Sequence, residues 1–425
     1  MKLLGLHAAP KKCLVPDITA GYPSPNRSSL SIAAELPDPW LHTPEEDRLN
    51  RVGPAKSANE SETMEHHQIT GIRVGDTRFP HYDGAVTGFD GYWYPVLLSR
   101  QLGNELLSMR LFGDDVLFIR EKGQVYAWQD RCPHRGIKLS IGKREFPGTV
   151  SCRYHGWTFD LASGKLVAAL TDGPNSPLCG RVGVKTFPAA ERGGLIWIYK
   201  GEGTPPPLER DIPSELLSGR AAIEGRVTER AGDWRHAAEN GFDEGHGKYL
   251  HRDALFVTFM HPPAYVHCEV VPEEENWIGR KTKDYAFQAD YPNLGRWPKK
   301  YFFKSSKVLS RASIRMPCVL RIRFAHWTHF EWYVPSDPGR HRYIQVVVQD
   351  GGPLKRGLFH LRYWTYLRWL FHGGFNDQDA LVVEMMQTPP EHLYRPDLSI
   401  IGWRKLCESS QAQRLAQESA DKEQV

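Results

Sequence analysis

The sequence lacks several features that mark other classes of protein. It has no uncharged apolar run of transmembrane length, so we expect no membrane-spanning helix. Its formal net charge of +4 is too small to argue for nucleic-acid binding by itself. Its seven cysteines are odd in number and mostly scattered, which suits a reducing compartment better than a disulfide framework. We therefore expect a cytoplasmic protein that binds neither nucleic acid nor membrane.

The chain is long enough, at 425 residues, for two domains with separate cores. Residues 1–85 carry proline, serine, asparagine and mixed charge without periodicity, which predicts a poorly ordered extension. Met64 lies within it and is an alternative start to Met1. The proline- and glycine-rich stretch 201–207 predicts a linker, and the polar C-terminal end predicts a tail that frays. We expect four parts, namely an extension at 1–85, domains at 86–205 and 206–407, and a tail at 408–425.

Two Cys/His pairs form the first motif with recognisable chemistry. Cys132 and His134 are followed, after a gap of seventeen residues, by Cys152 and His155. Two thiolates and two imidazoles in this arrangement predict a metal site. Structural zinc uses such ligands, and so does a Rieske [2Fe–2S] centre, in which two Cys hold one iron and two His hold the other.

The spacing favours the Rieske centre, with zinc as the alternative. Each pair supplies one Cys and one His, so each of two loops can give one ligand to each iron. Gly136 and Gly156 follow the pairs closely, as expected where backbone N–H groups approach cluster sulfides. A zinc finger would instead place its two histidines together on a helix.

The two halves of the chain differ in predicted secondary structure. Short alternating strands surround the Cys/His loops and predict a small all-β domain. The second half mixes strands and helices without βαβ alternation, which predicts an α+β domain with an antiparallel sheet. We expect its strands at Ile223–Arg230, Ala264–Val271, Ile314–Phe324, His329–Val334 and Tyr343–Gln349, and its helices at Trp234–His251, Leu354–His372 and Asn376–Gln387.

The helix predicted at Leu354–His372 has two possible uses. Its basic and aromatic residues could suit a membrane surface. They are distributed among the apolar residues and not segregated to one face, so we favour an amphipathic helix packed on its own sheet.

A second candidate metal motif lies within Trp234–His251. Asp243 and His246 are three residues apart and share a helix face. His246 and His251 are five apart, about 140° on an ideal helix, so one unbroken helix would splay them. Gly245 and Gly247 make a local break plausible. With a break, two His and one carboxylate could bind one metal and leave positions open, as in non-haem Fe(II) oxygenases.

Together the two motifs resemble the terminal oxygenase subunit of the Rieske non-haem iron oxygenases. The resemblance runs from Gly91 to Leu406, and its motifs occur in the family's order and spacing. The segments EWYVP (331–335), GFNDQDA (374–380) and GWRKL (402–406) are similar to those of the carbazole dioxygenase and oxoquinoline monooxygenase group.

The resemblance implies an N-terminal all-β Rieske domain and a C-terminal catalytic domain of helix-grip, START-like form. It implies one [2Fe–2S] cluster and one Fe(II) per subunit, the iron bound by His246, His251 and Asp379, with Asp377 as the competing third ligand. Asp243 would link this iron to His155 of the neighbouring subunit. We also expect Asn240 and Phe242 to approach the substrate. The cluster ligands would be Cys132, His134, Cys152 and His155.

The implied activity is that of the terminal component of a multicomponent oxygenase. It would use O2, and electrons from NAD(P)H passed through a reductase and a ferredoxin, to mono- or dioxygenate a small aromatic or heteroaromatic compound. The implied assembly is a homotrimer. The alternatives are oxidative O- or N-dealkylation at the same iron, and a Rieske electron carrier without oxygenase activity. We expect pocket residues from Phe256–Pro263, the 280–325 region and Trp364–Phe375.

Overall fold

The computed structural model describes residues 79–173, 175–251, 254, 265–286, 311–324, 326–387 and 391–423. Several sequence-based expectations therefore lie outside the described residues. They concern Met64, most of the 1–85 extension, the pocket segment Phe256–Pro263, and residues 287–310 within the 280–325 region.

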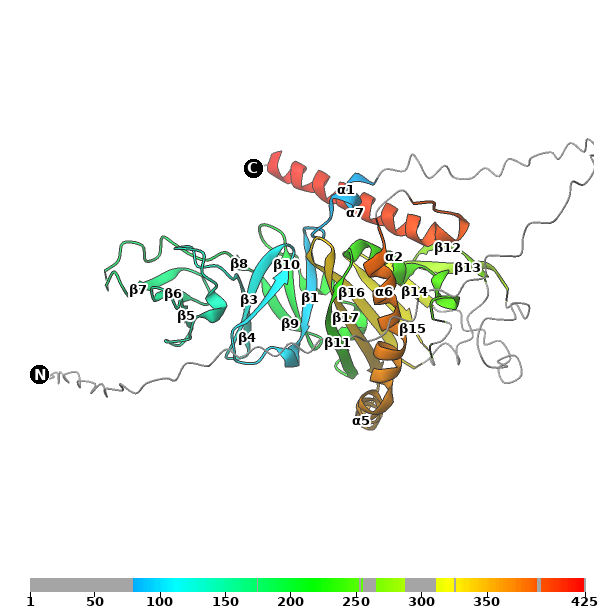
Figure 1. Ribbon diagram of the computed structural model, residues 1–425, viewed down its shortest axis with the longest axis horizontal. Coiled ribbons are helices and arrows are strands. Elements are labelled where there is room, and N and C mark those ends of the chain that lie inside the picture. The colour runs from blue at the N-terminus through cyan, green and yellow to red at the C-terminus, as the bar shows by residue number, and fades with distance from the viewer. Residues whose placement is uncertain are drawn as a thin grey trace, which may run out of the picture. The chain divides into compact units, whose positions relative to one another are not determined.

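The N-terminal half of the described chain consists of small antiparallel sheets, as expected for an all-β domain (Figure 1). One sheet has the order β1-β10-β9, a second β2-β3-β4-β8, and a third β5-β6-β7. The strands are β1 (Tyr92–Leu98), β2 (Leu107–Leu111), β3 (Asp114–Glu121), β4 (Gln124–Gln129), β5 (Thr149–Ser151), β6 (Trp157–Asp160), β7 (Leu166–Ala169), β8 (Thr186–Phe187), β9 (Ala189–Arg192) and β10 (Leu195–Lys200).

Tight turns connect the strands of the β2–β3–β4 meander. Lys122 and Gly123 both have positive φ, 48° and 80°, and join β3 to β4 in two residues. Such turns suit the right-handed twist of hairpin strands and favour glycine. The Cys/His loops follow β4 and β5, and they share a compact core with the strands around them, made of Leu117, Ile119, Trp128, Leu139, Val150, Phe159 and their neighbours.

The C-terminal half is organised around one antiparallel sheet, which within the described residues has the order β11-β17-β16-β15-β14-β13-β12. Its strands are β11 (Ala221–Ala231), β12 (Tyr265–Pro272), β13 (Ile278–Ala286), β14 (Arg311–Arg315), β15 (Val319–Arg323), β16 (Thr328–Asp337) and β17 (Arg340–Asp350). The expected α+β class is thus confirmed. The single strand predicted at Ile314–Phe324 is wrong, because Pro317 cannot continue a ladder and the chain turns there into a hairpin of β14 and β15.

Helices pack against this sheet, and the second motif directly follows one of them, α2. Helix α2 (Trp234–Phe242) contacts β15 and β16, and α6 (Asp377–Met385) contacts β11 and α2 (Figure 1). Helix α5 (Pro353–Arg362) continues in π-helical form through Tyr363–Leu367 and Trp369–Asn376 into α6. No helix in the described part of the chain is long and apolar enough to cross a membrane.

The helix expected at Leu354–His372 does pack on its own sheet. Phe359, Tyr363, Leu367 and Phe371 are buried in one cluster with Ala222 of β11 and Val347 of β17. Other large side chains of the helix point outward and are exposed, among them Leu354, Leu361 and Trp369.

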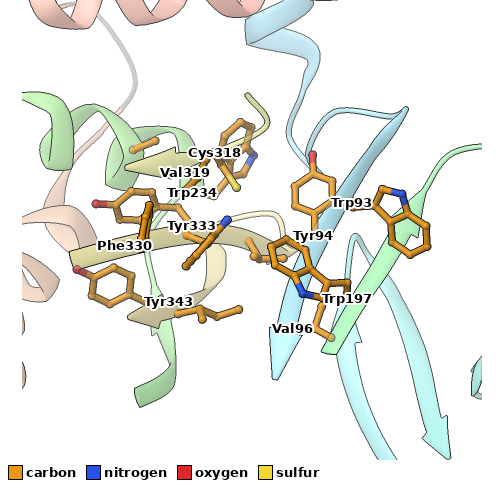
Figure 2. Close-up of a cluster of buried hydrophobic side chains, with 14 of the residues drawn as sticks. Trp93, Tyr94, Val96, Trp197, Trp234, Cys318, Val319, Phe330, Tyr333 and Tyr343 are labelled. Atoms are coloured by element: carbon orange, nitrogen blue, oxygen red, sulfur yellow. The ribbon is translucent and has the colours of Figure 1, made fainter. Parts of the chain in front are cut away.

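The main hydrophobic core includes residues of both halves. Trp197 of β10 meets Trp332 of β16 edge to face, with ring centroids 6.0 Å apart. Figure 2 shows other members of this core, with Tyr94 and Trp197 on the strands of the N-terminal half and Phe330 and Tyr333 on the large sheet. Burying such aromatic surface is worth about 2–3 kcal/mol per side chain.

Two expectations about the chain ends differ from the structure. Phe79 and Tyr82, counted within the extension, are buried, and helix α1 (Pro80–Gly84) packs on α7. The polar residues 408–423 do not form a separate fraying tail, because α7 (Leu398–Glu423) continues through them. Its inward-facing residues explain this: Cys407 is fully buried, and Glu408 accepts hydrogen bonds from the backbone N–H groups of α1.

Candidate metal centres

The two Cys/His loops have the same backbone construction. In each loop the Cys N–H donates to the carbonyl five residues on, at 2.8 Å for Cys132 and 2.7 Å for Cys152. The glycine four residues on donates back to the Cys carbonyl, at 2.8 and 3.0 Å. These glycines, Gly136 and Gly156, have φ of +75° and +65°, a conformation that side chains with a Cβ rarely adopt. The sequence therefore folds two matched loops that present their ligands together.

The ligand atoms of the loops fit an iron–sulfur cluster. Both thiols are buried, and burial together with the neighbouring Cys152 thiol raises the pKa of Cys132 to about 11. Such a thiol becomes a thiolate at neutral pH only when a metal stabilises the anion. The rings of His134 and His155 lie 4.7 Å apart, and Nδ1 of His155 is buried without a hydrogen-bond partner. Two thiols and two imidazoles, one of them with an unused buried nitrogen, suit a cluster held by both loops.

Aromatic rings flank the histidines of these loops. Trp157 stacks on His134, with centroids 4.7 Å apart and planes 10° from parallel. The Tyr154 ring lies 3.8 Å from that of His155 and is itself half exposed. His155 is thus shielded on one side and lies near the surface on which Tyr154 is exposed.

The second motif has the break that the histidine spacing demands. Helix α2 ends at Phe242, and a short 3₁₀ turn at His246–Lys248 follows, so the helical stretch expected at Trp234–His251 is interrupted before His246. The Asp243 carboxylate accepts hydrogen bonds from the backbone N–H groups of Gly245 and His246, at 2.8 and 3.0 Å. Asp243 therefore caps the new turn, as side-chain oxygens cap helix N-termini.

His246, His251 and Asp379 come together across the fold, with their possible ligand atoms all within 4.8 Å of one another. Asp379 Oδ1 lies 3.6 Å from Nε2 of His246 and 3.3 Å from Nε2 of His251. His251 is fully buried, and its Nε2 is a buried nitrogen without a hydrogen-bond partner. This donor set, two imidazoles and one carboxylate with an orphaned nitrogen between them, fits a divalent iron.

The electrostatics of this triad favour a charged carboxylate. Burial alone would raise the pKa of Asp379, but its contacts with His251 and His246 and the hydrogen bond from Asn240 hold that pKa below its usual value. Burial likewise opposes ionisation of Asp243, yet its hydrogen bonds with His246 and the backbone lower its pKa. Both groups are therefore carboxylates at neutral pH.

The two candidate carboxylates at the start of α6 face different partners. Asp377 pairs with Arg226 and Arg230, at 2.5 and 2.7 Å. Asp379 faces the histidines instead. Two residues along a helix correspond to about 200°, so the two carboxylates point to opposite sides of α6.

Other expected site residues lie nearby but have partners within the chain. Asn240 donates from Nδ2 to Oδ1 of Asp379 at 3.0 Å. Phe242 is fully buried, and the guanidinium of Arg280 lies over its ring at 5.3 Å. Contact of either side chain with substrate stays a prediction. Within the expected pocket segment, Phe375 reaches the triad and stacks on His251 at 3.9 Å.

Sequence reasoning missed Gln378. Its Oε1 lies 3.0 Å from Nδ1 of His251. The signal available was its position next to Asp379 in the sequence.

Comparisons with known proteins agree with this arrangement. A family model described as "Homotrimeric ring hydroxylase" matches residues 199–415, and one described as "Rieske [2Fe-2S] domain" matches residues 92–188. The terminal oxygenase component CarAa of carbazole 1,9a-dioxygenase from Sphingomonas sp is 34% identical over 385 residues, which cover 80% of this chain and 95% of that protein. The corresponding component from Metapseudomonas resinovorans is 31% identical and covers 76% and 91%.

Solved structures give the same result. The terminal oxygenase of carbazole 1,9a-dioxygenase from Novosphingobium sp. KA1 matches with a TM-score of 0.68 and 30% identity, covering 78% of this chain and 95% of that one. The reduced complex between oxygenase and ferredoxin in carbazole 1,9a-dioxygenase matches with a TM-score of 0.69 and 29% identity, covering 77% and 91%.

These matches confirm the predicted Rieske centre over structural zinc, and with it the two cofactors, a [2Fe–2S] cluster and a catalytic non-haem iron. They also confirm the expected fold and an oxidoreductase, and they give no support to a simple electron carrier. The chain belongs to the homotrimeric ring hydroxylases that carry a Rieske [2Fe–2S] domain.

Proposed function

We propose that this chain is the terminal oxygenase of a multicomponent system that hydroxylates a small aromatic or heteroaromatic compound. It takes up O2, and electrons from NAD(P)H through a reductase and a ferredoxin. The observation that carries the proposal is the buried group of His246, His251 and Asp379 in the same chain as the matched Cys/His loops. A protein that only carries electrons does not need this second metal-binding group.

The ligand assignment follows from the donor atoms. Cys132, Cys152, His134 and His155 would hold the [2Fe–2S] cluster, and His246, His251 and Asp379 the mononuclear iron. When bound, the cluster supplies single electrons and the ferrous iron supplies the chemistry of O2. The protein contributes position, charge and shelter from water.

Asp243 is proposed as the link between the two kinds of site. Its Oδ2 lies 3.0 Å from Nδ1 of His246 on its own chain. We infer that the carboxylate also accepts a hydrogen bond from His155 of the neighbouring subunit. In a homotrimer this pairing would connect a cluster-binding residue of one chain with an iron-binding residue of the next.

The surroundings of the triad suit an apolar substrate. Phe375 covers one face of His251. Apolar walls exclude water and hold an aromatic ring by its faces. Because the relatives are named for carbazole, we propose an aromatic heterocycle of similar size as the substrate class. No described residue favours O- or N-dealkylation over ring hydroxylation. We also propose the cytoplasm as its location, since the scattered cysteines suit a reducing compartment.

A substrate panel tests this function. The purified protein is combined with a surrogate ferredoxin and reductase, NADH and candidate heterocycles, and hydroxylated product is measured and not NADH loss, which uncoupling can mimic. We expect product from at least one heterocycle, and none from an Asp379→Ala variant that keeps its cluster spectrum. Product from Asp379→Ala would contradict the assigned iron site, and dealkylated product alone would replace the proposed reaction.

A further inference from the structure

Three side chains from consecutive turns of the η9–α6 segment (η9 is the π-helical stretch Trp369–Asn376) surround the His251 ring. Phe375 stacks on its face, with centroids 3.9 Å apart and planes 27° from parallel. Gln378 Oε1 lies 3.0 Å from Nδ1, and Asp379 Oδ1 lies 3.3 Å from Nε2. The orientation of this histidine is therefore set by one segment of the chain.

The contact with Gln378 determines which nitrogen of His251 carries the proton. An amide oxygen can only accept a hydrogen bond, so Nδ1 must be the protonated nitrogen. In a neutral imidazole Nε2 then carries the lone pair. That nitrogen is buried, has no hydrogen-bond partner and belongs to the group within 4.8 Å.

The two histidines of the triad are held by groups of different charge. His246 faces a carboxylate, with Asp243 Oδ2 3.0 Å from its Nδ1. His251 faces a neutral amide at the same distance. With Fe(II) bound, the negative charges of Asp379 and Asp243 balance the charge of the metal. A neutral residue at position 378 thus leaves the buried site without excess charge, which a low dielectric disfavours.

We propose that Gln378 is a positioning residue of the iron site: its amide oxygen holds His251 in the Nδ1–H tautomer, so that the Nε2 lone pair points at the metal. The proposal rests on the assignment of His251 as an iron ligand under the proposed function. Groups that orient metal-bound histidines in this way are worth about 10–100-fold in metal affinity.

The chain offers a matched set of variants. Gln378→Leu removes the acceptor at similar volume, Gln378→Glu keeps an acceptor in place, and Gln387→Leu makes the same chemical change at an exposed glutamine beyond the end of α6. Each purified full-length variant is titrated with Fe(II) against a competing ferrous chelator without O2. The visible spectrum of the Rieske cluster and the thermal unfolding temperature report on the fold.

We expect Gln378→Leu to bind mononuclear iron about 10–100-fold more weakly while its cluster spectrum and unfolding temperature stay those of the parent. Gln378→Glu should bind more tightly than Gln378→Leu, because its carboxyl oxygen still accepts the hydrogen bond from His251, and Gln387→Leu should be unchanged. Rescue by glutamate separates a positioning role from a merely structural one, since both replacements alter packing but only glutamate accepts the hydrogen bond.

A His251→Ala variant distinguishes failure of the role proposed for Gln378 from failure of the assignment of His251 as an iron ligand. Loss of mononuclear iron in His251→Ala with unchanged affinity in Gln378→Leu would overturn the role of Gln378 alone. Retention of the iron in His251→Ala would overturn the ligand assignment itself. Equal weakening in Gln378→Leu and Gln378→Glu would also contradict the proposal, because the acceptor would then not matter.

Discussion

Asn240 donates a hydrogen bond from Nδ2 to Oδ1 of Asp379, 3.0 Å away, and so joins α2 to α6 across the candidate iron site. The two residues are 139 positions apart in the sequence. This bond lowers the pKa of the carboxylate and restricts its rotation, together with the two histidines. Through Asn240, α2 therefore orients the carboxylate that we propose as the third iron ligand.

Removing this donor should weaken the iron site. We expect Asn240→Ala to bind mononuclear iron about 10-fold more weakly, because a buried carboxylate that loses a donor is harder to keep ionised and oriented. Chelator competition measures the affinity. Asn104→Ala, at an exposed position of the N-terminal half, is the control. An Asn240→Ala protein with unaltered iron affinity would show that the bond does not support the ligand.

The two aspartates of α6 should respond differently to alanine. Asp379→Ala should lose mononuclear iron and keep the cluster. Asp377→Ala should keep both, but lose about 1–3 kcal/mol of unfolding free energy, since Arg226 and the nearly buried Arg230 lose their charged partner. Metal analysis and chemical denaturation test the pair. Iron loss in Asp377→Ala alone would reverse the assignment.

Asp243→Asn should separate metal binding from turnover. The asparagine oxygen can still cap the turn at Gly245 and His246, so we expect both metals to stay bound. Product formation should fall about 10–100-fold, because a neutral amide supports the histidine and its proposed inter-subunit partner less well than a carboxylate. Metal content and product yield are compared in the same preparation. Normal product yield would remove Asp243 from the link between subunits.

His341 should make the protein less stable as the pH falls. Burial lowers the pKa of this histidine from 6.5 to about 4, and one of its nitrogens, Nδ1, lies 2.9 Å from the Gly232 carbonyl. Between these two pH values the unfolded chain binds a proton that the folded chain does not. Stability from this residue is therefore complete above pH 6.5 and declines toward pH 4, by up to about 1.4 kcal/mol per pH unit.

Denaturation of His341→Gln at pH 7, 6 and 5 measures this effect. Glutamine can still donate to the Gly232 carbonyl but does not titrate, so we expect a shallower decline below pH 6.5 than in the parent. His392→Gln, at an exposed histidine, should decline as the parent does. A slope in His341→Gln equal to that of the parent would show that this histidine does not govern the decline.

Several features of the site could be predicted because their causes are local. The Cys132–His134 and Cys152–His155 pairs each lie within one loop, and a glycine of positive φ closes each loop. The spacing of His246 and His251 also required a break in the helix. The residue that makes the break could not be predicted, because the Asp243 carboxylate caps the next turn only once α2 has ended.

The structure of the expected C-terminal tail, in contrast, depends on contacts with residues that are distant in the sequence. A polar composition predicts fraying where no packing opposes it, and residues beyond Cys407 are polar. The helix persists because buried Cys407 and the contacts of Glu408 with α1 stabilise it through residues distant in sequence. Amino-acid composition alone does not reveal contacts between residues that are distant in the sequence.

By itself the sequence indicated the metal chemistry of this protein, since its Cys/His pairs and its His/Asp motif at those spacings favour a Rieske cluster and a non-haem iron. Only the tertiary structure shows which carboxylate faces the two histidines and which amide contacts His251. Asp377 and Asp379 are the same residue type two positions apart, and no sequence pattern distinguishes Gln378 from other glutamines. The π-helical approach to α6 and the arginines of β11 turn Asp377 away and bring Gln378 and Asp379 to His251. That choice depends on the rotation of one helix against a sheet, which arises only when the core is packed.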